Sequence, residues 1–188
     1  MPTELEAKMK LIDRRAVEQR LRDLNAVDRG SRFEVNAFYD TPERKLLSKD
    51  SGVRLRSMRK PDGSTTCVIT FKGPQAKGQL KSRSEIEFGI EDIEKARDLL
   101  AELGYSKLLL RFEKRRHTYD LGNCEVVLDE LPHLGSFIEI EGPDEASVMA
   151  TRDQLGLANE PLITRGYSSL LDAAICAGEI AGPDVRFA

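Results

Sequence analysis

The sequence predicts a mainly β protein of the α+β class, an eight-stranded antiparallel β-barrel with helices packed outside it. Eight segments alternate side chains with the period of a strand, which indicates the β content. Four segments have the pattern of a surface helix, with apolar residues on one face. In addition, charged residues occupy one face of most of the predicted strands, and that face points either to solvent or into the barrel.

The strand assignments rest on alternation and on residues that favour extended backbone. The predicted strands are Pro2–Lys10, Phe33–Tyr39, Gly52–Arg59, Ser64–Lys72, Leu80–Gly89, Lys107–Asp120, Cys124–Glu130 and Ser136–Glu141. Turn sequences at 61–63 and 121–123 are expected to join the third strand to the fourth and the sixth to the seventh.

Four helices are expected between and after these strands. The first three each follow an aspartate that can accept hydrogen bonds from free backbone N–H groups, namely Asp13, Asp92 and Asp144. The predicted ranges are Arg14–Ala26, Ile93–Leu103, Glu145–Leu155 and Tyr167–Ala177. The sequence contains no repeat or linker, so we expect one domain over residues 1–181 and a flexible tail over 182–188.

Composition excludes several classes of protein. Charged residues make up 32% of the 188 residues, but the net charge is only −3. Such balance argues against a surface that coats nucleic acid, which would be strongly basic. Three cysteines without a CxxC pair give no disulfide framework. The charged N-terminus lacks an apolar signal region, and no apolar run is long enough for a membrane span, so a cytoplasmic location without membrane association is expected.

The charged faces of the strands have two interpretations. For any single strand, a face exposed to solvent is the simpler one. Across six strands, however, the polar positions are almost all Arg, Lys, Glu or Asp, whereas an exposed face usually mixes in Ser, Thr and Gln. Turning these side chains into a barrel costs much free energy unless they are paired, hydrated or bound to a ligand. Proteins accept that cost at binding sites, so the pattern favours a charged lumen.

The segment Glu4-Leu5-Glu6-Ala7-Lys8 resembles the ExExK signature of the CYTH family, also called triphosphate tunnel metalloenzymes. Later blocks follow the order of that family over about Thr3–Leu171: Arg54-x-Arg56, Lys72, Arg83-x-Glu85-x-Glu87, Lys114-x-Arg116, Asp129 and Glu139-x-Glu141. Residues 112–139 are most similar to the branch named after class IV adenylate cyclases. Asn36 departs from the family pattern, because relatives often carry an acid there, so the second strand is not counted among the ligands.

The resemblance implies a barrel whose lumen binds a triphosphate together with Mg²⁺ or Mn²⁺. Arginine suits phosphate because it gives paired hydrogen bonds, and lysine supplies a compact positive charge. The expected phosphate ligands are Lys8, Arg54, Arg56, Lys72, Arg83, Lys114 and Arg116. Carboxylates repel phosphate but suit hard divalent cations. The expected metal ligands are Glu4, Glu6, Glu85, Asp129, Glu139 and Glu141, and Glu6 and Glu87 are candidates for orienting an attacking water.

Three functions fit this set of residues. The first is hydrolysis of tripolyphosphate, ATP or another organic triphosphate at the terminal phosphoryl group. The second, favoured by the branch resemblance, is a class IV adenylate cyclase that converts ATP to cyclic AMP and pyrophosphate. The third is a non-catalytic polyphosphate-binding module, which would need the cations but not the carboxylates. The resemblance also implies a possible homodimer, and the sequence leaves the choice of metal and the number of metal ions open.

Overall fold

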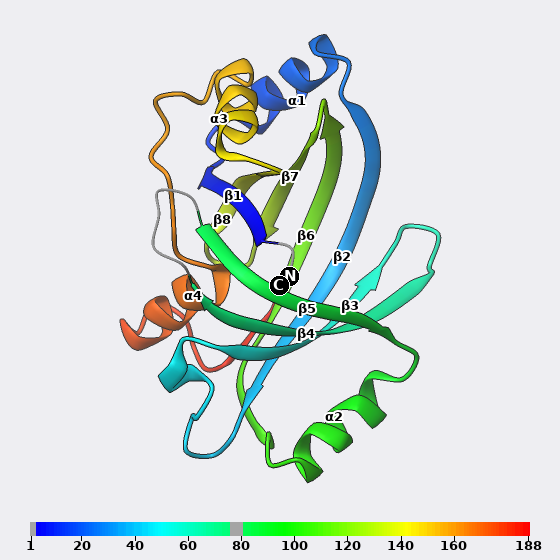
Figure 1. Cartoon of the computed structure of the whole chain (residues 1–188), viewed down its shortest axis with the longest axis vertical. Helices are drawn as coiled ribbons and strands as arrows, with labels where there is room; N and C mark the ends of the chain where they lie inside the picture. Colours follow the sequence, from blue (N-terminus) through cyan, green and yellow to red (C-terminus); the bar gives the residue numbers. More distant parts are fainter. Residues whose placement is uncertain (1–2, 76–80) are drawn as a thin grey trace.

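Eight antiparallel strands close into a barrel in this computed structural model, which describes residues 3–75 and 81–188, without the side chains at 3, 4, 81 and 82. The order around the ring is β2-β3-β4-β5-β1-β8-β7-β6, and pairing of β6 with β2 closes it (Figure 1). The strands are β1 Thr3–Lys10, β2 Val27–Asp40, β3 Gly52–Arg59, β4 Thr65–Gln75, β5 Lys81–Ile90, β6 Lys107–Leu121, β7 Cys124–Leu131 and β8 Gly135–Gly142. The predicted fold class is confirmed.

The helices begin where the sequence predicts them. They are α1 Arg14–Asp23, α2 Ile93–Glu102, α3 Glu145–Gln154 and α4 Tyr167–Cys176, with a short 3₁₀ helix at Leu47–Lys49. Asp13, Asp92 and Asp144 each accept a hydrogen bond from a backbone N–H in the first turn, as expected for N-caps. The N-cap of α4 is Gly166, which supplies no side-chain hydrogen bond.

Strand β2 begins at Val27 rather than at Phe33. Residues 27–32 pair with β6 alone, and pairing with β3 begins at Phe33. This first part of the strand is polar and includes a register shift between Asp28 and Gly30, whose φ is 85°. A polar segment with a bulge has no regular alternation, so residues 27–32 carry no strand signal in the sequence.

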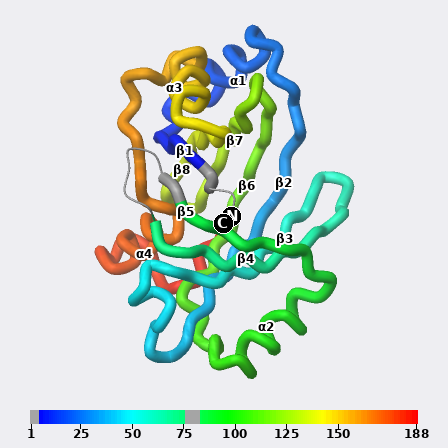
Figure 2. Tube along the Cα trace, in the orientation of Figure 1, coloured from blue at the N-terminus to red at the C-terminus, as the bar shows by residue number. Residues whose placement is uncertain are grey.

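Apolar side chains cover the outside of the barrel, and helices bury many of them there, whereas Phe71, Ile86 and Phe88 of β4 and β5 are exposed. Helices α1 and α3 pack over β1, β6, β7 and β8 at one end of the molecule, and α2 packs over β3 and β4 at the other (Figures 1 and 2). The buried residues of the larger layer include Ala7, Met9, Val17, Leu21, Val126, Leu128, Ile138, Ile140 and Val148. The alternate positions on the same strands therefore face the lumen.

Helix α4 closes one end of the lumen with an apolar plug. Leu171 and Ala174 of the helix pack in one cluster with Leu110, Phe112 and Phe137 of the strands. Phe112 and Phe137 have the same strand parity as the lumen residues Lys114 and Glu139, so this cluster lies inside the barrel. The lumen is thus apolar next to α4 and charged beyond it.

A short strand lies within residues 182–188, the segment predicted as a flexible tail. Asp184–Val185 form a short strand, β9, parallel to β6 at Arg111 and Phe112. Val185 is 1% exposed in the plug cluster. One buried valine and a strand pairing hold this segment against the barrel.

Within the described residues, no helix is long and apolar enough to cross a membrane.

Candidate functional site

Cross-strand register brings the predicted charged positions together inside the barrel. Lys8 of β1 lies opposite Glu139 of β8, and Glu6 lies opposite Glu141. On the other wall, Lys72 of β4 lies opposite Glu85 of β5. Cations and carboxylates therefore alternate around the lumen.

A first cluster joins β1 and β8. The Lys8 ammonium lies 3.0 Å from Glu6 Oε1 and 3.1 Å from Glu139 Oε1, and Lys8 is 1% exposed. Burial on its own would lower the pKa of Lys8, but the charges of Glu139 and Glu6 raise it above its usual value. Arg116 contacts the other oxygen of Glu139 at 2.5 Å. Two carboxylates thus converge on one cation.

A second cluster joins β2, β6 and β7. Asp129 is fully buried and accepts two hydrogen bonds from Arg116, at 2.7 and 2.5 Å. Lys114 lies 3.2 Å from Asp129 and 3.2 Å from Glu34. Burial, together with the nearby charge of Arg116, lowers the pKa of Lys114 to about 8. Because Lys114 is 2% exposed, the carboxylates of Asp129 and Glu34 offset its charge, and solvent does not.

A third cluster lies on β3, β4 and β5. Arg54 donates to Thr70 Oγ1 at 3.0 Å and to Glu87 Oε2 at 3.3 Å, and Thr70 donates to the same Glu87 oxygen at 2.6 Å. Burial and the neighbouring charge of Arg56 lower the pKa of Arg54 to about 9. The Glu87 side chain is 43% exposed, so this carboxylate reaches the wet part of the site.

The remaining predicted cations also have acidic or polar partners. Lys72 pairs with Glu85 across β4 and β5. Arg56 donates to Asn36 Oδ1 at 2.8 Å. Arg83 pairs with Asp50, at the end of the 3₁₀ helix, at 2.9 Å. The seven predicted phosphate ligands thus occur on β1, β3, β4, β5 and β6. The side chain of Glu4, a predicted metal ligand, lies outside the described residues.

Sequence reasoning missed three residues of this site. Glu34 is fully buried among Lys114, Arg56 and Arg32, on the strand that the Asn36 departure had set aside. Alternation of Arg32, Glu34 and Asn36 was a usable signal. The other two missed residues are Asp50, which follows no strand pattern, and Tyr167, which starts a helix and whose ring lies 4.2 Å from the Lys8 ammonium.

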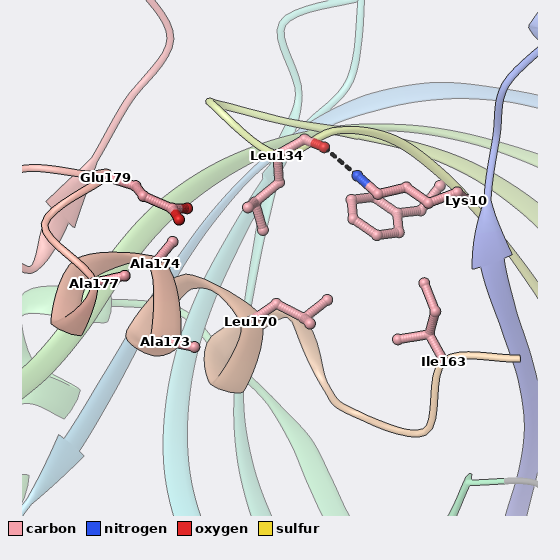
Figure 3. Close-up of a pocket in the computed structure, with 9 residues that line it drawn as sticks. Lys10, Leu134, Ile163, Leu170, Ala173, Ala174, Ala177 and Glu179 are labelled. Atoms are coloured by element: carbon pink, nitrogen blue, oxygen red, sulfur yellow. Dashed lines mark hydrogen bonds between the residues drawn. The ribbon is translucent and has the colours of Figure 1, made fainter. Parts of the chain in front are cut away.

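Two cavities lie outside these clusters for the most part. One, of about 350 Å³, is lined mainly by apolar residues of α4 and has Lys10 and Glu179 at its edges (Figure 3). The Lys10 ammonium donates there to the Leu134 carbonyl. The other, of about 970 Å³, is lined by Phe33, Arg59 and Arg115 of three neighbouring strands, among others. The apolar cavity lacks the cations that a triphosphate requires.

The donor chemistry of the lumen fits a divalent ion that keeps some of its waters. No three acidic, histidine or cysteine side chains form a ready metal cluster in the described part of the chain. Mg²⁺, however, is commonly held by one or two carboxylates and by substrate phosphates. The convergence of Glu6 and Glu139 on the Lys8 ammonium supplies such a carboxylate pair.

The fold and the candidate site together define a class of protein, a closed antiparallel barrel with helices outside and buried cations and carboxylates inside. The family model described as the CYTH domain matches residues 2–167. The chain therefore belongs to the CYTH domain family, and the resemblance seen in the sequence is confirmed.

Individual relatives agree with this assignment. The chain is 33% identical over 151 residues to the adenylate cyclase CyaB of Aeromonas hydrophila, covering 76% of this chain and 74% of that protein. A solved structure from Pyrococcus horikoshii superposes with a TM-score of 0.78 at 28% identity, covering 90% and 98% of the two chains. A Hippeastrum protein for which a dominant triphosphatase activity is described has the same fold, with a TM-score of 0.65 at 19% identity over 97% and 99%.

Proposed function

We propose that this protein is a divalent-metal-dependent enzyme that hydrolyses a triphosphate at its terminal phosphoryl group. The observation that carries the proposal is the alternation of buried cations and carboxylates around one lumen. Cations alone would suffice for binding an anion. The retained carboxylates, with the Glu6 and Glu139 pair converging on one cation, support a metal-dependent reaction as well.

The cations divide into two walls that would hold the phosphate chain between them. Lys8, Lys114 and Arg116 form one wall, and Arg54, Arg56 and Lys72 form the other. In the free protein their charges are offset by carboxylates, so an incoming triphosphate exchanges partners with these acids. Asp129 and Glu85, also expected as metal ligands, contact neighbouring Lys and Arg side chains in the free protein, as Glu6 and Glu139 do, and they remain further expected ligands.

Glu6, Glu139 and Glu141 would hold Mg²⁺ or Mn²⁺, with Glu4 as a further expected ligand. When bound, the ion neutralises charge on the phosphate oxygens. Glu87 accepts hydrogen bonds from Arg54 and Thr70, and its partial exposure leaves room to orient a water. Glu6 is the alternative for that role. Water adds to the terminal phosphorus and gives up a proton to the orienting carboxylate or to solvent, the bond to the bridging oxygen breaks, and orthophosphate and a diphosphate leave.

The second candidate is an adenylate cyclase. It is favoured by the Aeromonas relative of that name. In this case the ribose 3′-hydroxyl attacks the α-phosphorus of ATP, and pyrophosphate leaves. The third candidate, a non-catalytic polyphosphate-binding module, does not explain why the carboxylates accompany the cations. A homodimer remains a prediction that sedimentation analysis tests.

Phosphorus NMR of the purified protein with ATP, and separately with tripolyphosphate, distinguishes the three candidates. With Mg²⁺ or Mn²⁺ present, we expect ATP to give orthophosphate and ADP, and tripolyphosphate to give orthophosphate and pyrophosphate. Pyrophosphate with cyclic AMP from ATP, and no change in tripolyphosphate, would instead identify the cyclase. Tight binding of ATP or tripolyphosphate without any product would identify the non-catalytic binding module.

A further inference from the structure

Tyr167 lies where the charged lumen meets the apolar plug. It is the first residue of α4, and it is 8% exposed. Its ring packs edge-on against Phe137, with the centroids 5.2 Å apart. The Lys8 and Lys114 ammonium groups lie over the ring, 4.2 and 5.4 Å from its centroid. One side of this tyrosine therefore belongs to the core and the other to the phosphate-binding cations.

The phenol hydroxyl of Tyr167 is buried and has no hydrogen-bond partner among the described residues. A buried donor left unpaired costs free energy, and proteins rarely accept that cost without a function. The charges near it are those of the lumen. Burial, followed by the charges of Asp129 and Glu139, raises the pKa of the phenol well above its usual value, so it stays protonated and able to donate.

The start of α4 adds a second source of donors, close to Lys8. The N-cap, Gly166, provides no side-chain oxygen for the first N–H groups of the helix. The positive end of a helix favours an anion there. Lys8, which also donates to the Arg165 carbonyl at 3.3 Å, links this turn to the carboxylates of β1 and β8.

We propose that the Tyr167 hydroxyl and the first turn of α4 form a subsite that binds the phosphoryl group nearest the plug, together with Lys8 and Lys114. The ligand class is a phosphoryl oxygen of a linear triphosphate, whether from tripolyphosphate or from ATP. This inference rests on the proposed function. It adds a neutral donor to a site that the sequence describes only by its charges.

Calorimetric titration of Tyr167→Phe with tripolyphosphate and with ATP tests the subsite, using Mg²⁺ and conditions without turnover. The variant keeps the ring, its contact with Phe137 and both cation contacts, and it removes only the hydroxyl. We expect binding of both ligands to weaken about 10- to 100-fold, the scale of a hydrogen bond to a charged group. Weakening with ATP alone would place the hydroxyl against the nucleoside part and overturn the subsite.

Tyr119→Phe is the matched control, because Tyr119 is also 8% exposed but lies in the outer layer under α1. Its affinities should equal those of the wild type. The melting temperature of the ligand-free protein separates a binding role from a structural one. Removing an unpaired buried hydroxyl should leave this melting temperature unchanged or raise it.

Two further results would contradict the inference. Unchanged affinity of Tyr167→Phe for both ligands would remove the hydroxyl from the site while leaving the proposed function intact. A lower melting temperature without ligand, together with weaker binding, would show that the hydroxyl supports the fold. If the wild-type protein bound neither ligand, the proposed function itself would fail, and this outcome is visible before any variant is made.

Discussion

The buried charges of the lumen hold one another in place, residue by residue. Asp129 contacts both Arg116 and Lys114, and Glu34 contacts Lys114 and Arg56. Removing one partner of a buried pair leaves the other charge uncompensated, which usually destabilises a protein strongly. Variants in this network therefore need a stability measurement beside every activity measurement.

Glu139→Gln should abolish turnover while the barrel still folds. The amide preserves the shape of the side chain but removes the charge that a divalent ion would need. We expect a loss of about 100-fold or more in turnover at saturating metal, above the upper range for outer partners of metal ligands. Glu130→Gln, on the outer face of the neighbouring strand, is the control and should retain full activity. Normal turnover by Glu139→Gln would remove this residue from the metal site.

Arg56→Ala should weaken triphosphate binding by about 1.5–3 kcal/mol, the scale of a hydrogen bond to a charged group. Its guanidinium is mostly buried and faces the lumen. Arg59→Ala serves as the control because it removes the same side chain from the exposed end of the same strand. Isothermal titration calorimetry with tripolyphosphate measures both. Equal affinities of Arg56→Ala and the wild type would mean that Arg56 does not contact the phosphates.

Glu34→Gln should lower stability at neutral pH by about 3–5 kcal/mol, because it removes the buried negative charge that Lys114, Arg56 and Arg32 share. Burial on its own would raise the pKa of Glu34, but the charges of Lys114 and Arg56 outweigh it and hold that pKa well below its usual value. A depressed carboxyl pKa stabilises the fold above the unfolded pKa, and this contribution is lost as pH falls through the folded value.

The difference in stability between wild type and Glu34→Gln should therefore shrink as the pH falls below about 4.5, near the ordinary pKa of a glutamate. Urea unfolding at several pH values measures it. A difference that stays constant down to acid pH would show that Glu34 contributes through packing and not through its charge.

The sequence predicted the charged set because strand alternation is a local property. Arg54 and Arg56, or Glu139 and Glu141, share a face whatever the rest of the chain does. Tyr167 could not be found in this way. Its position in the lumen depends on α4 folding back over the barrel end, and nothing within a few residues of Tyr167 encodes that contact. The orphaned hydroxyl, likewise, is visible only once its neighbours are placed.

At the scale of elements, helix caps were the most predictable feature and the chain end was the least. An aspartate at an N-cap acts within three residues, so Asp13, Asp92 and Asp144 marked their helices correctly. Strand β9 has only two residues and gains its stability from β6 and from one buried side chain. Such a short element has no periodicity to detect.

Val185→Ala should lower the free energy of unfolding by about 1–2 kcal/mol, from the lost methyl groups and the cavity they leave in the plug. Arg186→Ala, an exposed neighbour, should change it by less than about 0.5 kcal/mol. Denaturant unfolding compares the two. Equal stability of Val185→Ala and wild type would restore the original expectation of a loose tail.

At the scale of the molecule, the described part of the barrel carries a lumen whose cations are paired with carboxylates of the same chain. A ligand that binds the folded state alone raises stability by about 2.7 kcal/mol at 100 times its dissociation constant. For a protein of this size that corresponds to a rise in melting temperature of about 5–10 °C. We expect tripolyphosphate with Mg²⁺ to produce this shift and adenosine to produce none. An equal shift with adenosine would mean that binding depends on the base and not on the phosphates.

The position of β1 in the ring has a consequence for how the protein acquires its activity. Strand β1 lies between β5 and β8, and β2 pairs with β6, so both strands have partners far along the sequence. Closure by such distant pairings is slow, on the order of milliseconds to seconds. During synthesis, Lys8 is made before Glu139 and can meet it only after β8 has been made. Until then, the strand that carries Glu6 and Lys8 has at least one unpaired edge. The candidate site is complete only when β8 joins β1.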